Sequence, residues 1–205
     1  MQVHQLECRR GERPLFSNLT FSLSEKELLW VSGPNGSGKT TLLRTLSGLL
    51  SPSAGEILWK GKAIQDWGDD YYADLLYLGH LNALKLELTV LENIRFSLVL
   101  SGQQCSDNQL RNALKRLGLI EHALKPCRYL SQGQKRRVAL CRLLLDSATL
   151  WILDEPFVAL DHDSIDHVLM IMRQHLNSGG RIILTTHQEV AFQGMEVKRV
   201  ALDEN

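Results

Sequence analysis

The chain contains 205 residues, of which 44% are hydrophobic and 22% are charged, proportions typical of a globular protein with an apolar core. Lysine and arginine together number 23, as do aspartate and glutamate, which argues against binding to nucleic acid or anionic lipid through bulk positive charge. No apolar run approaches the roughly 20 residues that cross a bilayer, and no export signal is visible at the start, so we expect a cytosolic protein.

The N-terminal segment alternates apolar and polar residues, as half-buried antiparallel strands do. Strands are expected over residues 2–8 and 19–23, with a turn over residues 11–14. A further hairpin is expected where residues 56–59 run into the turn at 60–62. Together these segments predict an antiparallel β subdomain.

A short apolar strand over residues 28–32 runs directly into a glycine-rich loop. The segment after this loop predicts a helix, because its leucines recur at helical spacing. These leucines are Leu42, Leu43, Leu46, Leu49 and Leu50.

The middle of the chain predicts helices over residues 89–100, 107–117 and 134–147. Apolar strands over 149–153 and 181–185 then flank a helix over 164–177. Alternating strands and helices indicate an α/β fold with a largely parallel sheet.

We therefore expect a single domain over residues 1–205. Its core comprises residues 1–88 and 148–205, and a helical subdomain over about 89–147 is inserted between them.

The glycine-rich loop fits the phosphate-binding pattern G-x-x-x-x-G-K-[ST]. Its glycines let successive backbone N–H groups point at phosphate oxygens, and the following helix directs its positive end there. Lys39 supplies a charge for the β- and γ-phosphates, and the Thr40 hydroxyl can bind Mg²⁺. The predicted nucleotide-binding residues of this segment are Gly33, Pro34, Asn35, Gly36, Ser37, Gly38, Lys39, Thr40 and Thr41.

Two acids follow the apolar strand near residue 150. A parallel strand buried on both faces presents polar groups at its carboxyl end, where ligands bind in open α/β sheets. Asp154 is expected to hold Mg²⁺, and Glu155 to orient or deprotonate the attacking water.

Residues 130–134 form a third element, Leu-Ser-Gln-Gly-Gln, at the start of a basic helix. A serine hydroxyl and glycine N–H groups at a helix N-terminus suit phosphate. The predicted phosphate contacts here are Ser131, Gly133 and Gln134.

With these motifs the sequence resembles the ATP-binding subunit of ABC transporters over essentially its whole length. Residues 33–40 resemble the Walker A loop, 150–155 the Walker B strand and 130–134 the signature motif. The resemblance extends to Asp161 in the D-loop and to His187 as the switch histidine that contacts the γ-phosphate. It implies a P-loop NTPase (RecA-like) core that hydrolyses ATP with Mg²⁺.

The resemblance also implies how the subunit assembles. Two copies would form a homodimer, each ATP lying between one copy's Walker A loop and the other copy's signature motif. Closure on ATP and reopening after hydrolysis would drive an integral membrane subunit. Leu81, Leu84, Leu86 and Leu88 are candidate docking residues for it, and about half of them are expected to belong to the core instead.

The sequence departs from the general family pattern at two positions. His80 stands where most relatives carry a glutamine that senses γ-phosphate and Mg²⁺, and it is either a replacement sensor or a plain loop residue. Near the N-terminus, Arg10 stands where relatives stack an aromatic ring on adenine. Arg10 either stacks on the base through its guanidinium plane or is solvated.

Several local features together resemble the ATP-binding subunit of the haem exporter of cytochrome c maturation in Gram-negative bacteria. They include Gly79-His80, the run from Trp151 to Phe157 and Gly179-Gly180 followed by Thr-Thr-His-Gln. This subfamily implies a peripheral location on the cytoplasmic face of the inner membrane and a membrane partner such as CcmB.

An ABC ATPase that acts on nucleic acid or ribosomes is the alternative. Its support is the basic run of residues 135–137 with Arg142, which is otherwise interpreted as a solvated helix face beside the nucleotide. The neutral net charge argues against this alternative.

Overall fold

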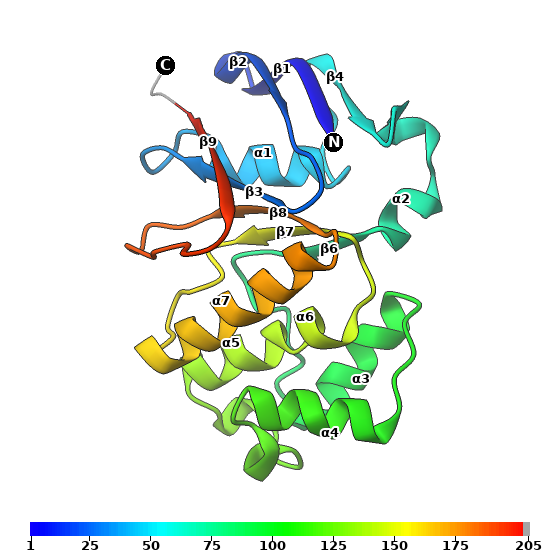
Figure 1. Ribbon diagram of the computed structural model, residues 1–205, viewed down its shortest axis with the longest axis vertical. Coiled ribbons are helices and arrows are strands. Elements are labelled where there is room, and N and C mark those ends of the chain that lie inside the picture. The colour runs from blue at the N-terminus through cyan, green and yellow to red at the C-terminus, as the bar shows by residue number, and fades with distance from the viewer. Residues whose placement is uncertain (203–205) are drawn as a thin grey trace.

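The computed structural model describes residues 1–202, which form two β-sheets and a block of helices (Figure 1). The first sheet is antiparallel, with the strand order β2-β1-β4-β5. Its strands are β1 (Gln2–Arg10), β2 (Arg13–Ser22), β4 (Ala54–Trp59) and β5 (Lys62–Ala63).

The second sheet is parallel throughout, with the strand order β6-β7-β8-β3-β9. Its strands are β3 (Glu27–Ser32), β6 (Leu75–Leu78), β7 (Leu150–Asp154), β8 (Arg181–Thr185) and β9 (Glu196–Ala201). Because the strands are parallel, their carboxyl ends meet at one edge of the sheet, where ligands bind in folds of this kind.

One helix, α1 (Lys39–Leu46), lies between the two sheets, and the short α2 (Asp69–Ala73) precedes β6 (Figure 1). The other helices lie on the opposite side of the parallel sheet (Figure 1). They are α3 (Val90–Leu100), α4 (Asp107–Arg116), α5 (Gln132–Leu140), α6 (Arg142–Leu145) and α7 (His162–Asn177). Across residues 1–202, no helix combines the length and the apolar character that a membrane span requires.

Successive side chains of a strand point to opposite faces of the sheet. In the parallel sheet, both sets of side chains are buried. Leu29, Ile152 and Ile183 belong to the core shared with α1 and the antiparallel sheet. Their neighbours Leu28, Trp151 and Ile182 belong to the core shared with the other helices. The continuous apolar runs of these strands thus hold the sheet between two layers.

The α/β architecture predicted from the sequence is confirmed, including the antiparallel N-terminal sheet and the helices between β6 and β7. Strands β6 and β9 were not predicted. The first is only four residues long, and the second carries charged residues and is half-exposed at the sheet edge.

Two helix predictions were wrong in extent. The helix expected to run through Leu50 ends at Leu46, since Gly48 adopts a left-handed conformation (φ 74°). Leu49 and Leu50 are therefore 56% and 42% exposed instead of packing in the core. The helix expected over residues 134–147 is divided at Cys141 into α5 and α6.

Candidate functional site

The glycine-rich loop connects β3 to α1 and needs glycine at both of its ends. Gly33 has φ 149°, and a Cβ there would lie 2.4 Å from the carbonyl oxygen of Leu202. Gly38 caps α1 with φ 96°, and a Cβ there would lie 3.1 Å from the Cβ of Leu15. The loop is therefore pressed against β2 and the chain after β9, in a conformation that other residues rarely adopt.

Lys39 is buried at the start of α1 and folds back over this loop. Its Nζ donates to the carbonyl oxygens of Gly33 at 2.7 Å and Pro34 at 2.8 Å. Burial lowers the pKa of Lys39, while the nearby carboxylates of Glu155 and Asp154 oppose that shift. An ammonium group held here by backbone oxygens is placed to receive phosphate oxygens.

The two carboxylate oxygens of Asp154, at the end of β7, accept from two different hydroxyls, one in the first turn of α1 and one at the end of β8. Thr40 donates to Oδ2 at 2.8 Å, and Thr185, the residue paired with Asp154 on β8, donates to Oδ1 at 2.7 Å. The backbone N–H of Glu155 donates to the Thr185 hydroxyl at 3.0 Å. Asp154 is thus fixed between the glycine-rich loop and β8.

Glu155 adopts a left-handed backbone conformation (φ 51°), which is costly for a residue other than glycine. Its Oε2 accepts from the backbone N–H of His187 at 3.2 Å. Its Oε1 is buried without a hydrogen-bond partner among residues 1–202, and the Nε2 of His187 lies 3.6 Å away. One carboxylate oxygen is therefore available to accept a proton or a water hydrogen bond.

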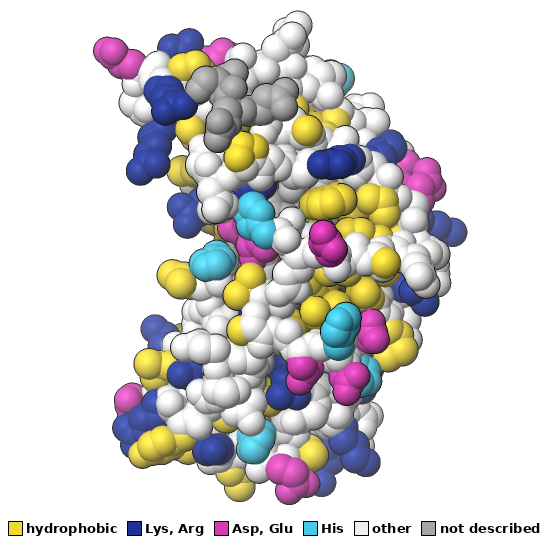
Figure 2. All heavy atoms as spheres, turned by 90° about the vertical axis from the view of Figure 1, so that its left-hand side faces the viewer, with side chains coloured by type: hydrophobic (Ala, Val, Ile, Leu, Met, Phe, Trp, Pro, Cys, Tyr) yellow, Lys and Arg dark blue, Asp and Glu magenta, His cyan; other side chains and the backbone are white. Residues whose placement is uncertain are grey.

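These groups surround a single cavity of about 660 Å³, a size typical of small-molecule sites. Figure 2 shows the side of the molecule that is on the left in Figure 1, with histidine side chains next to acidic ones near its middle. The predicted site residues that line the cavity are Asn35, Gly36, Gly38, Lys39, Thr40, Thr41, His80, Asp154, Glu155 and His187. Four separate segments of the chain thus converge at the carboxyl edge of the parallel sheet.

The donor set fits a hard divalent cation such as Mg²⁺, which takes oxygen ligands. The hydroxyl of Thr40 and the carboxylate of Asp154 already lie within hydrogen-bond distance of one another. The buried hydroxyl of Ser37 also has no hydrogen-bond partner among the described residues.

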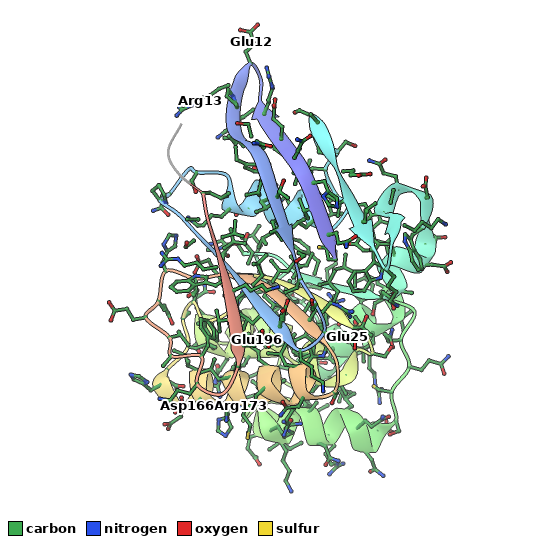
Figure 3. The ribbon with its side chains drawn as sticks, turned by 45° about the horizontal axis from the view of Figure 1, so that its top comes forward. Glu12, Arg13, Glu25, Asp166, Arg173 and Glu196 are labelled. Atoms are coloured by element: carbon green, nitrogen blue, oxygen red, sulfur yellow. The ribbon has the colours of Figure 1, made fainter. Side chains whose placement is uncertain are left out.

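Arginines and leucines also line the cavity. Arg9 and Arg10 come from the end of β1, beside the hairpin turn where Figure 3 labels Glu12 and Arg13. Leu15, Arg44 and Leu50 line the cavity as well. No Phe, Tyr or Trp is among the described residues that line the cavity.

The residues predicted in the signature motif and D-loop do not line the cavity. Ser131 and Gln134 form a capping box, in which Ser131 Oγ accepts from the Gln134 N–H at 3.1 Å. Asp161 caps α7, accepting from the N–H of Ser164 at 2.9 Å. A Cβ on Gly133 would lie 2.5 Å from the carbonyl oxygen of Ala159, so these two segments pack directly against each other on another surface.

The sequence interpretation missed Thr185 and Arg44 and was wrong about Arg136. Arg136 was expected on a solvated helix face, but it is 3% exposed and donates to the backbone beside Asp154 and Glu155. Thr185 could have been found as the polar residue that ends the strand expected at residues 181–185. No sequence signal distinguishes Arg136 from the adjacent Lys135 and Arg137.

Comparison with known proteins identifies the family that this chain matches. Residues 16–158 match the family model described as ABC transporter, and residues 126–192 match an AAA domain model. A Dechloromonas aromatica protein named cytochrome c biogenesis ATP-binding export protein CcmA is 52% identical over 202 residues, covering 98% of this chain and 99% of its own length.

Solved structures agree with the sequence match. A Pyrococcus furiosus protein described as an ABC transporter ATP-binding protein superposes with a TM-score of 0.84 at 28% identity, covering 98% of this chain and 96% of that one. A dimeric ATP-binding cassette bound to ADP and Pi, in a post-hydrolysis state, gives a TM-score of 0.76 at 25% identity, covering 91% and 88%.

Proposed function

Because the chain belongs to the ABC transporter family of ATP-binding subunits, we propose that it hydrolyses ATP to drive the haem exporter of c-type cytochrome biogenesis. The observation that carries the chemistry is the convergence of Lys39, Asp154, Glu155 and His187 around one cavity. The pathway rests on relatives named for cytochrome c biogenesis and export, which match this chain over nearly its full length.

In the proposed reaction, the glycine-rich loop and Lys39 hold the triphosphate of ATP against the N-terminus of α1. Glu155 accepts a proton from the water that attacks the γ-phosphorus, and the bond from that phosphorus to the β–γ bridging oxygen breaks. ADP leaves with the bridging oxygen, while His187, and His80 from the facing loop, contact the γ-phosphate. Mg²⁺, held by Thr40 and Asp154, would neutralise charge on the phosphate oxygens.

The second half of each site would come from a second copy of the chain. Ser131, Gly133, Gln134 and Asp161 lie outside the cavity of their own chain, and Ser131 and Asp161 are exposed. In a head-to-tail homodimer, this surface would close over the ATP bound by the other copy. In this division, residues 1–88 and 148–205 bind nucleotide, and the helical segment 89–147 carries the signature motif across.

A groove beside the nucleotide cavity supports docking of an integral membrane subunit. It has a volume of about 260 Å³ and is lined by the loop after β6 and by α3, including Leu81, Leu84, Phe96 and Leu100. Leu81 and Leu100 are 82% and 72% exposed, and large exposed apolar side chains mark interaction sites. We assign this groove to a membrane partner such as CcmB, with the ATPase on the cytoplasmic face of the inner membrane.

The alternative, an ABC ATPase that acts on nucleic acid or ribosomes, depends on a basic surface formed by residues 135–137 and Arg142. Arg136 is buried, and Arg142 pairs with Asp146 at 3.4 Å. Because of these contacts, fewer of these basic side chains are free to bind the phosphate backbone of a nucleic acid. The structure therefore favours the transporter.

The proposal is tested by recovering the partner from detergent-solubilised membranes. A Glu155→Gln chain with ATP should retain a closed dimer and bring with it a multi-span cytochrome c maturation protein, identified by mass spectrometry. The matched control, Lys39→Ala, should lose every ATP-dependent partner because it cannot hold the triphosphate. Recovery of ribosomal or DNA-bound proteins instead would support the alternative and overturn the transport assignment.

A further inference from the structure

Arg136 is the most completely bonded buried charge beside the candidate site. Its five N–H groups make five hydrogen bonds, of which three go to the backbone around Glu155. They reach the carbonyl oxygens of Asp154 at 3.0 Å, Glu155 at 2.8 Å and Pro156 at 3.2 Å. The same guanidinium donates to the carbonyl oxygen of Gly79 at 3.2 Å and to Oδ1 of Asn82 at 3.1 Å.

The bonds to residues 154–156 span the point where the backbone is strained. A left-handed conformation at a residue other than glycine costs about 1–3 kcal/mol and persists only where its surroundings enforce it. Arg136 binds the carbonyl before, at and after Glu155, which has that conformation. The guanidinium thus holds the backbone turn that aims the Glu155 carboxylate into the cavity.

The remaining bonds join this turn to two other parts of the molecule. Gly79 and Asn82 flank His80 in the loop that lines both the nucleotide cavity and the apolar groove. Arg136 itself belongs to α5, the helix that begins at Ser131. One rigid, planar side chain therefore connects the signature helix, the Glu155 turn and the His80 loop.

We propose that Arg136 is a positioning residue. Through it, the orientation of the Glu155 carboxylate and the position of the His80 loop depend on the position of α5. This inference rests on the proposed function, because α5 would move when its N-terminus engages ATP bound to the second copy. Engagement at one ATP would then align the water-activating carboxylate at the other. Through this link, the rate of hydrolysis at the paired sites depends cooperatively on the ATP concentration.

The test uses steady-state hydrolysis and ATP affinity of the purified full-length chain. Arg136→Lys keeps the charge but cannot donate to five acceptors, so kcat should fall about 10–100-fold, the size expected when a reacting group is slightly misplaced. The Kd for ATP should change less than about twofold, and the Hill coefficient should fall to about 1. Arg137→Lys is the matched control: it makes the same exchange one position along α5 and keeps the charge near Asp161, while the Nη1 of Arg137 donates to the carbonyl oxygen of Leu117 at 3.1 Å, within the helical block.

A second pair of variants keeps the test decisive if the Arg136 variants do not fold. Asn82 is partly buried, and Asn82→Ala removes the side-chain oxygen that accepts from Arg136 without leaving an unpaired charge in the core. Asn82→Asp restores an oxygen that can accept this hydrogen bond. Loss of kcat and cooperativity in the first, with recovery in the second, is expected. A folded Arg136→Lys chain with wild-type kcat and Hill coefficient would overturn the inference, as would unchanged kinetics in Asn82→Ala. A wild-type chain that hydrolyses no ATP, or does so without cooperativity, would instead overturn the paired-site function itself.

Discussion

The hydroxyl of Thr40 donates to a carboxylate oxygen of Asp154 at 2.8 Å, joining the glycine-rich loop to the end of β7 across 114 residues of sequence. The other carboxylate oxygen of Asp154 accepts from Thr185. Three separate segments are therefore bonded to one another, so their oxygen atoms are oriented for a cation.

The Thr40 hydroxyl should matter for nucleotide affinity only when Mg²⁺ is present. Thr40→Val keeps the shape of the side chain but removes its oxygen, so the Kd for ATP with Mg²⁺ should rise about tenfold, or about 1.4 kcal/mol. With Mg²⁺ removed by EDTA, the two chains should bind ATP alike in calorimetry. Thr40→Ser should restore affinity, and an equal loss with and without the metal would contradict the ligand role.

Glu155→Gln should bind ATP normally and hydrolyse it about 10²–10⁴-fold more slowly, because an amide cannot accept the proton of the attacking water. The substitution is close to isosteric and leaves an amide oxygen or nitrogen near the His187 N–H. Single-turnover hydrolysis measures the effect. Glu189→Gln is the control, since that exposed carboxylate lies in the same segment outside the cavity. Near-normal turnover by the Glu155 variant would mean that another residue is the general base.

Ser131→Arg should prevent dimer closure while leaving ATP binding to the single chain unchanged. Ser131 is exposed at the start of α5, outside the cavity of its own chain. In a Glu155→Gln background, light scattering with ATP should show dimers that disappear with the added arginine. Ser131→Ala loses the same helix cap, which costs about 1 kcal/mol, and should still dimerise. Hydrolysis retained by Ser131→Arg alone would contradict the shared site.

The arginines that line the cavity should discriminate poorly between purine bases. A guanidinium plane stacks on either base, and both purines offer N7 as an acceptor for its N–H groups. ATP and GTP should therefore bind within about fivefold of each other, less than 1.4 kcal/mol apart. Arg10→Ala should weaken both equally, whereas a strong preference of the wild-type chain for ATP would exclude base contact by arginine alone. Fluorescent analogues of both nucleotides provide the measurement.

Stability should depend on pH through His175, whose ring stacks on Trp151 with centroids 3.7 Å apart and planes within 9°. Burial lowers the pKa of His175 from 6.5 to about 4. The unfolded chain therefore takes up this proton first, so the stabilisation is complete above pH 6.5 and is lost as pH falls toward 4. The slope is at most about 1.4 kcal/mol per pH unit.

Urea unfolding between pH 4.5 and 7.5 measures this dependence. His175→Leu should reduce the pH dependence of the free energy of unfolding, because it removes the titrating group. His162→Gln, a change at an exposed position at the start of α7, should leave it as in the wild type. Identical pH profiles for His175→Leu and the wild type would show that other groups account for the acid sensitivity.

The local chemistry of this protein could be inferred from short stretches of its sequence. The loop from Gly33 to Thr40, the acids Asp154 and Glu155 after an apolar strand, and the signature-like run over residues 130–134 are contiguous patterns. Their residue types indicate what each short segment can bind, so a binding role could be predicted for each of them without knowledge of the fold. The apolar runs of the parallel strands likewise indicated burial on both faces.

Which distant groups meet became clear from the fold alone. Arg136 and Arg137 are adjacent and chemically identical, yet only the first is buried against the Glu155 turn. Thr185 became a partner of Asp154 through the register of β7 with β8. Such contacts depend on how helices and strands pack across the sheet. That packing is a property of the whole core, and no local pattern encodes it.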